Sequence, residues 1–189
     1  RFRFEDVENN VPFTLKLRIP GWLRKGKVSV NGAVVAELDK KSAESYFDVR
    51  VEDIANTVVE LDMDLTPRLT IAHTKVEEDL NQVAVERGPL VYCVETMDSE
   101  AKDLGRIMIP VNAKFEESKM TIKGHELVTL ETEGLTFEDD EWYDEDALYQ
   151  TLDDTEVKPV KFRMIPYFAW DNRGMGEMII WLPAFWGKY

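Results

Sequence analysis

The chain has 189 residues, of which 44% are hydrophobic and 11% aromatic, enough to build the core of one large domain or two small ones. Its formal net charge of −14 argues against a nucleic-acid partner, because a phosphate backbone requires a basic face. No apolar run reaches the roughly 18 residues of a membrane-spanning helix. The sequence opens with Arg1-Phe2-Arg3-Phe4, which alternates like a strand, and we therefore expect a fragment of a longer protein.

Alternation of apolar and polar residues dominates the first third of the chain, as is typical of strands. Residues 13–19 place their apolar side chains on one face, and Pro20-Gly21 follows them. Asn31-Gly32 lies between two apolar runs and predicts a hairpin. The alternation continues through residues 46–54 and 57–73, where Pro67 indicates an edge or a bend. The best helical candidate, residues 51–56, is one turn at most.

Two apolar runs separated by Arg87-Gly88-Pro89 follow, and the second run, residues 90–94, is apolar on both faces. Such a run predicts a central strand that is covered on both sides. Residues 160–174 and 177–183 are further apolar strands, joined by a link rich in turn-forming residues. Many short strands of this kind predict an all-β fold, an antiparallel β-sandwich of the jelly-roll or immunoglobulin-like type.

The region between about residues 97 and 158 differs in texture, since it is more acidic and its strands are less distinct. Apolar strands return after Pro159. We therefore expect a domain boundary near residue 97.

Cys93, the only cysteine, decides whether the chain has an obvious nucleophile or metal ligand. Its neighbours Tyr92 and Val94 are those of an apolar strand, where burial would raise the pKa of the thiol and leave it inert. The two histidines, His73 and His125, lack a second Cys or His at zinc-ligand spacing. The sequence therefore predicts no catalytic residue and no metal ligand.

Acidic side chains offer two further candidates. The run of acids within residues 138–146 could bind calcium through its oxygens, but it lacks the central glycine of an EF-hand loop, and a solvated loop is the alternative. If the loop is ordered, Trp142 and Tyr143 would anchor it. A carboxylate pair for glycoside hydrolysis cannot be selected among 37 Asp and Glu residues.

Aromatic residues concentrate near the end of the chain. Tyr167, Trp170, Trp181 and Trp186 are candidates for an interface with a neighbouring domain or for stacking on sugar rings. Rings at alternating strand positions can equally well belong to a core.

Four segments, in their order along the chain, resemble the C-terminal β-sandwich region of glycoside hydrolase family 127, best known for retaining β-L-arabinofuranosidase activity. They are FTLKLRIPGW, VSVNG, AHTKVEEDLNQVAVERGPLVYCVE and IPYFAWDNRGMGEMIIWLP. The resemblance covers nearly the whole chain and is weakest over residues 97–158. It implies two sandwiches, one interrupted by the other, which fits the change in texture near residue 97. Residues 1–97 and 159–189 would form the main sandwich, and residues 98–158 a smaller inserted one. The resemblance also implies a catalytic (α/α)6 barrel before the sandwich, with a zinc-bound cysteine nucleophile. No residue of this chain matches that motif, and Cys93 corresponds to a sandwich-strand cysteine, so zinc is implied only for the barrel.

The resemblance implies a non-catalytic portion of a glycoside hydrolase that packs on and supports its own catalytic barrel. An alternative is a carbohydrate-binding module for arabinose-containing or other plant-wall glycans. A sandwich that is itself an enzyme would need acids or histidines clustered in a cleft. Expected partners are the barrel, a carbohydrate or a second copy in a homodimer. The plant-glycan association favours a periplasmic or secreted protein.

Overall fold

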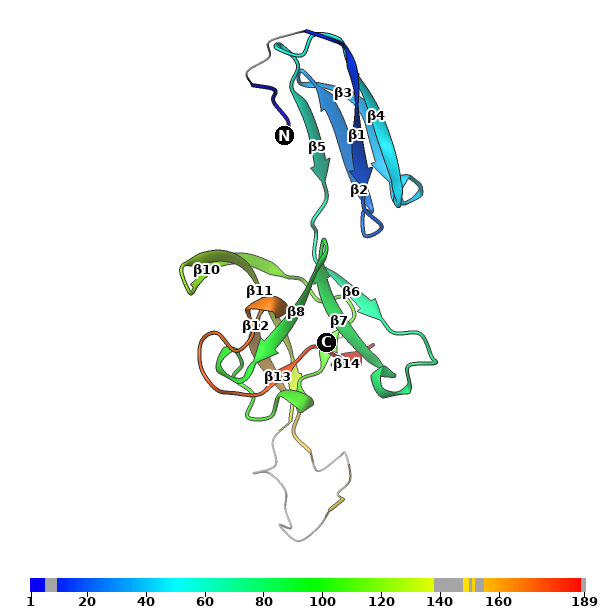
Figure 1. Cartoon of the computed structure of the whole chain (residues 1–189). Coiled ribbons are helices and arrows are strands. Elements are labelled where there is room, and N and C mark those ends of the chain that lie inside the picture. Colours follow the sequence, from blue (N-terminus) through cyan, green and yellow to red (C-terminus); the bar gives the residue numbers. More distant parts are fainter. Residues whose placement is uncertain (6–9, 138–147, 150, 152–154, 188–189) are drawn as a thin grey trace. The chain divides into compact units, whose positions relative to one another are not determined.

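The computed structural model describes residues 1–5, 10–137, 148–149, 151 and 155–187. These residues form strands joined by turns and short 3-10 helices, and the all-β prediction is confirmed. Within them, no helix is long and apolar enough to cross a membrane. The chain divides into two compact units, Arg1–Thr66 and Pro67–Tyr189 (Figure 1).

The first unit contains two antiparallel sheets. One pairs β1 with β4, and the other has the order β3-β2-β5. The strands are β1 (Phe13–Ile19), β2 (Lys25–Val30), β3 (Ala33–Asp39), β4 (Ser45–Val51) and β5 (Val59–Met63). Their inward residues form one core, which includes Leu17, Val28 and Val49, as expected for a small β-sandwich.

The predicted hairpin at Asn31-Gly32 is confirmed. These two residues connect β2 to β3, and both have positive φ angles, 49° and 82°. A two-residue turn of this kind matches the twist of the flanking strands, and glycine adopts it without steric cost. The Asn31 side-chain oxygen also accepts a hydrogen bond from the Val58 backbone N–H at 2.8 Å, which ties the turn to the start of β5.

The second unit contains a nine-stranded sheet. Seven of its strands follow the order β10-β11-β12-β8-β7-β14-β9, and the other two, β6 and β13, pair with β7 and β8 respectively. The pairs are antiparallel except for β9 and β14. The strands are β6 (Arg68–Ile71), β7 (Gln82–Arg87), β8 (Leu90–Glu95), β9 (Ile109–Pro110), β10 (Glu116–Ile122), β11 (His125–Thr136), β12 (Lys158–Pro166), β13 (Met178–Ile179) and β14 (Leu182–Phe185).

This sheet closes on itself. Met108, just before β9, exchanges two backbone hydrogen bonds with Leu135 of β11, at 2.8 and 2.9 Å. The path β11-β12-β8-β7-β14-β9 therefore returns to β11, and buried residues from all six of these strands form one core. Gly134 permits the closure, because a Cβ atom there would lie 2.5 Å from the Met108 carbonyl oxygen.

β8 is the central strand that the sequence predicts. It pairs with β7 on one side and β12 on the other, and Gly88 turns the chain between β7 and β8 with a φ angle of 59°. Tyr92 and Val94 face the main core, whereas Cys93 faces a second cluster with Ile122, Ile165 and Ala169. Both faces of the strand are therefore covered.

The division into units differs from the predicted one. The expected boundaries near residues 97 and 158 lie inside the second unit, and the main observed boundary is at Thr66 and Pro67. β10 and β11, which lie between the expected boundaries, pair with β12 in the same sheet as β8. β10 and β11 therefore do not form a separate sheet.

Candidate functional site

The corner after β12 holds three of the late aromatic residues, Tyr167, Phe168 and Trp170. Pro166 ends the strand, a 3-10 turn (η7, Tyr167–Ala169) follows, and β13 returns the chain to β8. Between them, Asp171 and Gly174 have positive φ angles of 61° and 155°. The Asn172 side-chain amide donates to the backbone carbonyls of Ala169 and Trp170 at 3.2 and 3.1 Å. Residues 167–176, which we call the aromatic turn, are therefore held locally by their own side chains.

A second set of bonds fastens the end of the aromatic turn to the end of β8. The Thr96 backbone N–H donates to the Glu177 carbonyl at 3.1 Å, and the Glu177 backbone N–H donates to the Thr96 hydroxyl at 3.0 Å. These bonds join positions that are 81 residues apart in the sequence.

Arg173 forms the centre of a buried ion-pair cluster. Its guanidinium bonds Glu95 at the end of β8 and Asp98 in the following 3-10 turn, η3 (Thr96–Asp98). Nε lies 3.0 Å from a Glu95 oxygen, and Nη1 lies 3.1 Å from an Asp98 oxygen. Both carboxylate side chains are only 3% exposed. Glu95 also accepts the Asp171 backbone N–H at 3.1 Å.

The ion pairs of this cluster stabilise the fold. The hydrogen bond to Asp98, with the further bond and charge of Glu95, raises the pKa of Arg173 above its usual value, so the guanidinium stays charged. The planar Arg173 guanidinium donates hydrogen bonds to two buried carboxylates at once, a geometry that lysine cannot reproduce. The cluster therefore pins the aromatic turn to the central strand.

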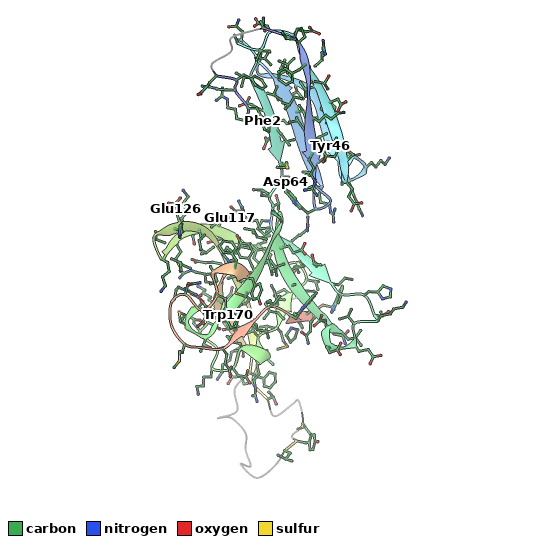
Figure 2. The ribbon with its side chains drawn as sticks, viewed as in Figure 1. Phe2, Tyr46, Asp64, Glu117, Glu126 and Trp170 are labelled. Carbon is green, nitrogen blue, oxygen red and sulfur yellow. The ribbon has the colours of Figure 1, made fainter. Side chains whose placement is uncertain are left out.

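The aromatic turn presents its rings to solvent. Tyr167 and Trp170 stack with ring centroids 6.1 Å apart and planes 11° from parallel, and they are 43% and 40% exposed (Trp170 is labelled in Figure 2). Phe168 is 63% exposed. Of the four predicted aromatic site residues, the structure thus brings Tyr167 and Trp170 together. Trp181 is half-buried before β14, and Trp186, after that strand, is exposed.

Cys93 is fully buried in the second cluster of β8. Burial, with the nearby charge of Glu95 as a smaller cause, raises the pKa of its thiol to about 12, so it stays protonated at neutral pH. His73 and His125 are exposed, and His73 Nδ1 accepts only a local bond from the Lys75 backbone N–H at 3.1 Å. Over the described ranges, no group of three or more His, Cys, Asp or Glu residues could hold a metal ion. The acidic run at 138–146, with Trp142 and Tyr143, lies outside those ranges.

Glu95, Asp98 and Arg173 are the residues that sequence reasoning missed. Glu95 offered a usable signal, because it is an ionisable residue at the end of a strand that is apolar on both faces. A buried carboxylate in such a place requires a cationic partner. The identity of that partner depends on the pairing of β13 with β8. The short apolar run around Met178 and Ile179 did not indicate which strand it would pair with.

Comparison with known proteins matches both units to domains of glycoside hydrolases. Residues 1–65 match the model of the middle domain of family 127, described as β-L-arabinofuranosidase, and residues 67–183 match the family 127 C-terminal domain. The chain therefore belongs to glycoside hydrolase family 127. The limits of the two matches agree with the division at Thr66 and Pro67.

Individual relatives are much longer than this chain. A non-reducing end β-L-arabinofuranosidase of Bifidobacterium longum is 32% identical over 166 residues, which are 86% of this chain and 24% of that protein. A solved glycoside hydrolase is 40% identical with a TM-score of 0.80, covering 92% of this chain and 28% of its own. A family 127 β-L-arabinofuranosidase from Geobacillus stearothermophilus T6 is 31% identical with a TM-score of 0.80, covering 94% and 27%. The chain spans about a quarter of the length of these relatives.

Proposed function

We propose that this chain is the non-catalytic β-sandwich portion of a β-L-arabinofuranosidase-like glycoside hydrolase, and that it packs on and supports a helical catalytic barrel. The matched domains are the middle and C-terminal ones, and the relatives carry about three quarters of their length outside the matched part. The helical form of the catalytic domain is inferred from the family resemblance alone. Cys93 supports a non-catalytic role, because its protonated, buried thiol cannot act as a nucleophile.

The observation that carries the packing role is the exposed, rigidly held aromatic turn. Large exposed rings beside one another are uncommon on an isolated soluble surface and are frequent at interfaces. Here the rings of Tyr167, Phe168 and Trp170 are exposed while the buried Arg173 cluster holds the backbone beneath them. A surface that is ordered before it binds loses less conformational entropy on docking. The aromatic turn is therefore our candidate for the face that contacts the barrel.

Assays of the purified chain test this proposal. We expect no product from an aryl β-L-arabinofuranoside above the blank rate, whereas addition of the chain should raise the melting temperature of the separately produced catalytic domain, since binding stabilises the folded form. Inhibition by a zinc chelator should affect the catalytic domain only. Hydrolysis by the chain alone, free of any other polypeptide, would refute the proposal.

A carbohydrate-binding module remains the second candidate, and the Tyr167–Trp170 stack favours it. Two nearly parallel rings at the surface resemble a platform on which a sugar ring can stack. The two candidates differ in what Trp170→Ala would do. Under the module function, the substitution abolishes glycan binding by the isolated chain; under the packing function, it weakens association with the catalytic domain.

A further inference from the structure

A groove of about 900 Å³ lies on the second unit. The three-stranded part β10-β11-β12 contributes to it, together with residues 97–100 and 110–114. β12 alternates across this sheet. Val160 and Phe162 are buried in the core, whereas the exposed Lys161 and the half-buried Arg163 line the groove, to which Phe162 also contributes. The groove is therefore a polar hollow on the outer face of the closed sheet.

Strand register arranges the charged side chains of the groove in two rows. Glu131 lies opposite Arg163, and Glu133 lies opposite Lys161, so each row pairs an acid with a base. Residues 97–100 run along the other side of β12, where the Glu100 backbone N–H donates to the Lys161 carbonyl at 3.3 Å. The two rows thus present the same chemistry two positions apart along the strands, with the pair Thr132 and Phe162 between them.

The first row is satisfied internally. Glu131 accepts two bonds from Arg163, at 3.0 and 2.9 Å, and a third from the Ser118 hydroxyl at 3.2 Å. The bond from Arg163 is the main cause that lowers the pKa of Glu131, so the carboxylate stays ionised. Asp98, which Arg173 also binds, lies 3.9 Å from Arg163. This row is a structural network.

The second row is open. Among the residues that the structure describes, neither the Glu133 carboxylate nor the Lys161 ammonium has an ion-pair or hydrogen-bond partner, and both side chains belong to exposed residues. Lys114 lines the same part of the groove and is also exposed. The Glu133 carboxylate, which can only accept hydrogen bonds, and the Lys161 ammonium, which can only donate them, therefore line the groove from opposite positions on β11 and β12.

The charged residues that line the groove favour some classes of ligand over others. A hydroxyl group can donate to a carboxylate and accept from an ammonium at the same time, so neighbouring hydroxyls of a sugar match Glu133 and Lys161. An anion would meet more carboxylates than cations, since the lining includes Asp98, Glu100, Glu116, Glu131 and Glu133 against Lys114, Lys161 and Arg163. At the open row itself, Lys114 and Lys161 would repel a cationic ligand. The volume is at the upper end of the range for ligand sites, roughly 300–1,000 Å³.

We infer that this groove binds a neutral saccharide, with Glu133 as the acceptor and Lys161 as the donor to adjacent hydroxyls. The site shares no residue with the Tyr167–Trp170 stack. It would give this chain a sugar-binding function of its own, on a surface that the aromatic turn does not include.

Titration of the isotope-labelled chain by NMR tests the inference, with L-arabinose and cellobiose as neutral probes and galacturonate and glucosamine as charged comparators. We expect shifts centred on β11 and β12 with a neutral probe and weaker effects with both charged sugars. Glu133→Gln and Lys161→Met should each weaken binding at least 10-fold without changing the melting temperature. Matched controls are Glu126→Gln and Lys119→Met, whose exposed 2.7 Å ion pair lies on the β10-β11 hairpin and does not line the groove (Glu126 is labelled in Figure 2).

Three results would overturn the inference. They are the absence of binding by either neutral probe, binding that survives both groove substitutions, and binding that Trp170→Ala abolishes while Glu133→Gln leaves it intact. The last result would assign sugar binding to the aromatic turn. None of the three bears on whether the chain docks to a catalytic domain, so failure here is distinguishable from failure of the packing proposal.

Discussion

Replacing Arg173 by methionine is expected to lower the free energy of unfolding of the second unit by about 3–5 kcal/mol. The substitution leaves the carboxylates of Glu95 and Asp98 buried, at 3% exposure each, without their shared guanidinium. The Asp171 backbone N–H and the more distant Arg163 would compensate only in part. Urea denaturation followed by circular dichroism measures the loss as a shift of the midpoint at constant slope.

Two further variants separate charge from packing. Lys119→Met removes an ion pair whose side chains are 68% and 63% exposed, and it should change stability by about 1 kcal/mol or less. Adding Glu95→Gln and Asp98→Asn to Arg173→Met should recover much of the loss, because the cost comes from uncompensated buried charge. If Arg173→Met proves as mild as Lys119→Met, the cluster does not hold the aromatic turn.

The second large effect concerns docking. Trp170→Ser and Phe168→Ser should each weaken association with the catalytic domain of the full-length protein by about 30-fold or more, equivalent to about 2 kcal/mol for a central aromatic contact. Isothermal titration calorimetry measures the affinity, and thermal melts establish that each variant is folded. Both side chains are exposed, so neither substitution removes a core contact.

Tyr46→Ser provides the comparison for these variants. Tyr46 is 64% exposed on β4 of the first unit, remote in sequence from the aromatic turn (Figure 2). We expect this substitution to leave the affinity within about twofold of the unmodified chain, as for most residues outside a hot spot. A large loss for Tyr46→Ser together with none for Trp170→Ser would place the docking face elsewhere.

The strands could largely be predicted from sequence because their signals are local. Period-two alternation located β1 and β4, Asn31-Gly32 located a hairpin, and the apolar run at 90–94 located the central strand. Each depends on residues within a few positions of one another. The burial of Cys93 and the raised pKa of its thiol followed in the same way, from its apolar neighbours.

The unit boundary and the buried cluster could not be predicted, because both depend on pairing between distant strands. The acidic texture of residues 97–158 suggested a boundary, although β10 and β11 in this region join the sheet of β8 by way of β12. Arg173 appeared in a turn-rich segment with no sign of burial. Its partners, 75 and 78 residues earlier in the chain, become neighbours only when β13 pairs with β8.

Hydrogen–deuterium exchange of this chain, alone and with the catalytic domain added, tests the packing role most directly. Our account predicts that residues 167–176 gain protection on addition of the catalytic domain, while the β2-β3 hairpin exchanges as before. Unchanged exchange at residues 167–176 in a complex that demonstrably forms would contradict it.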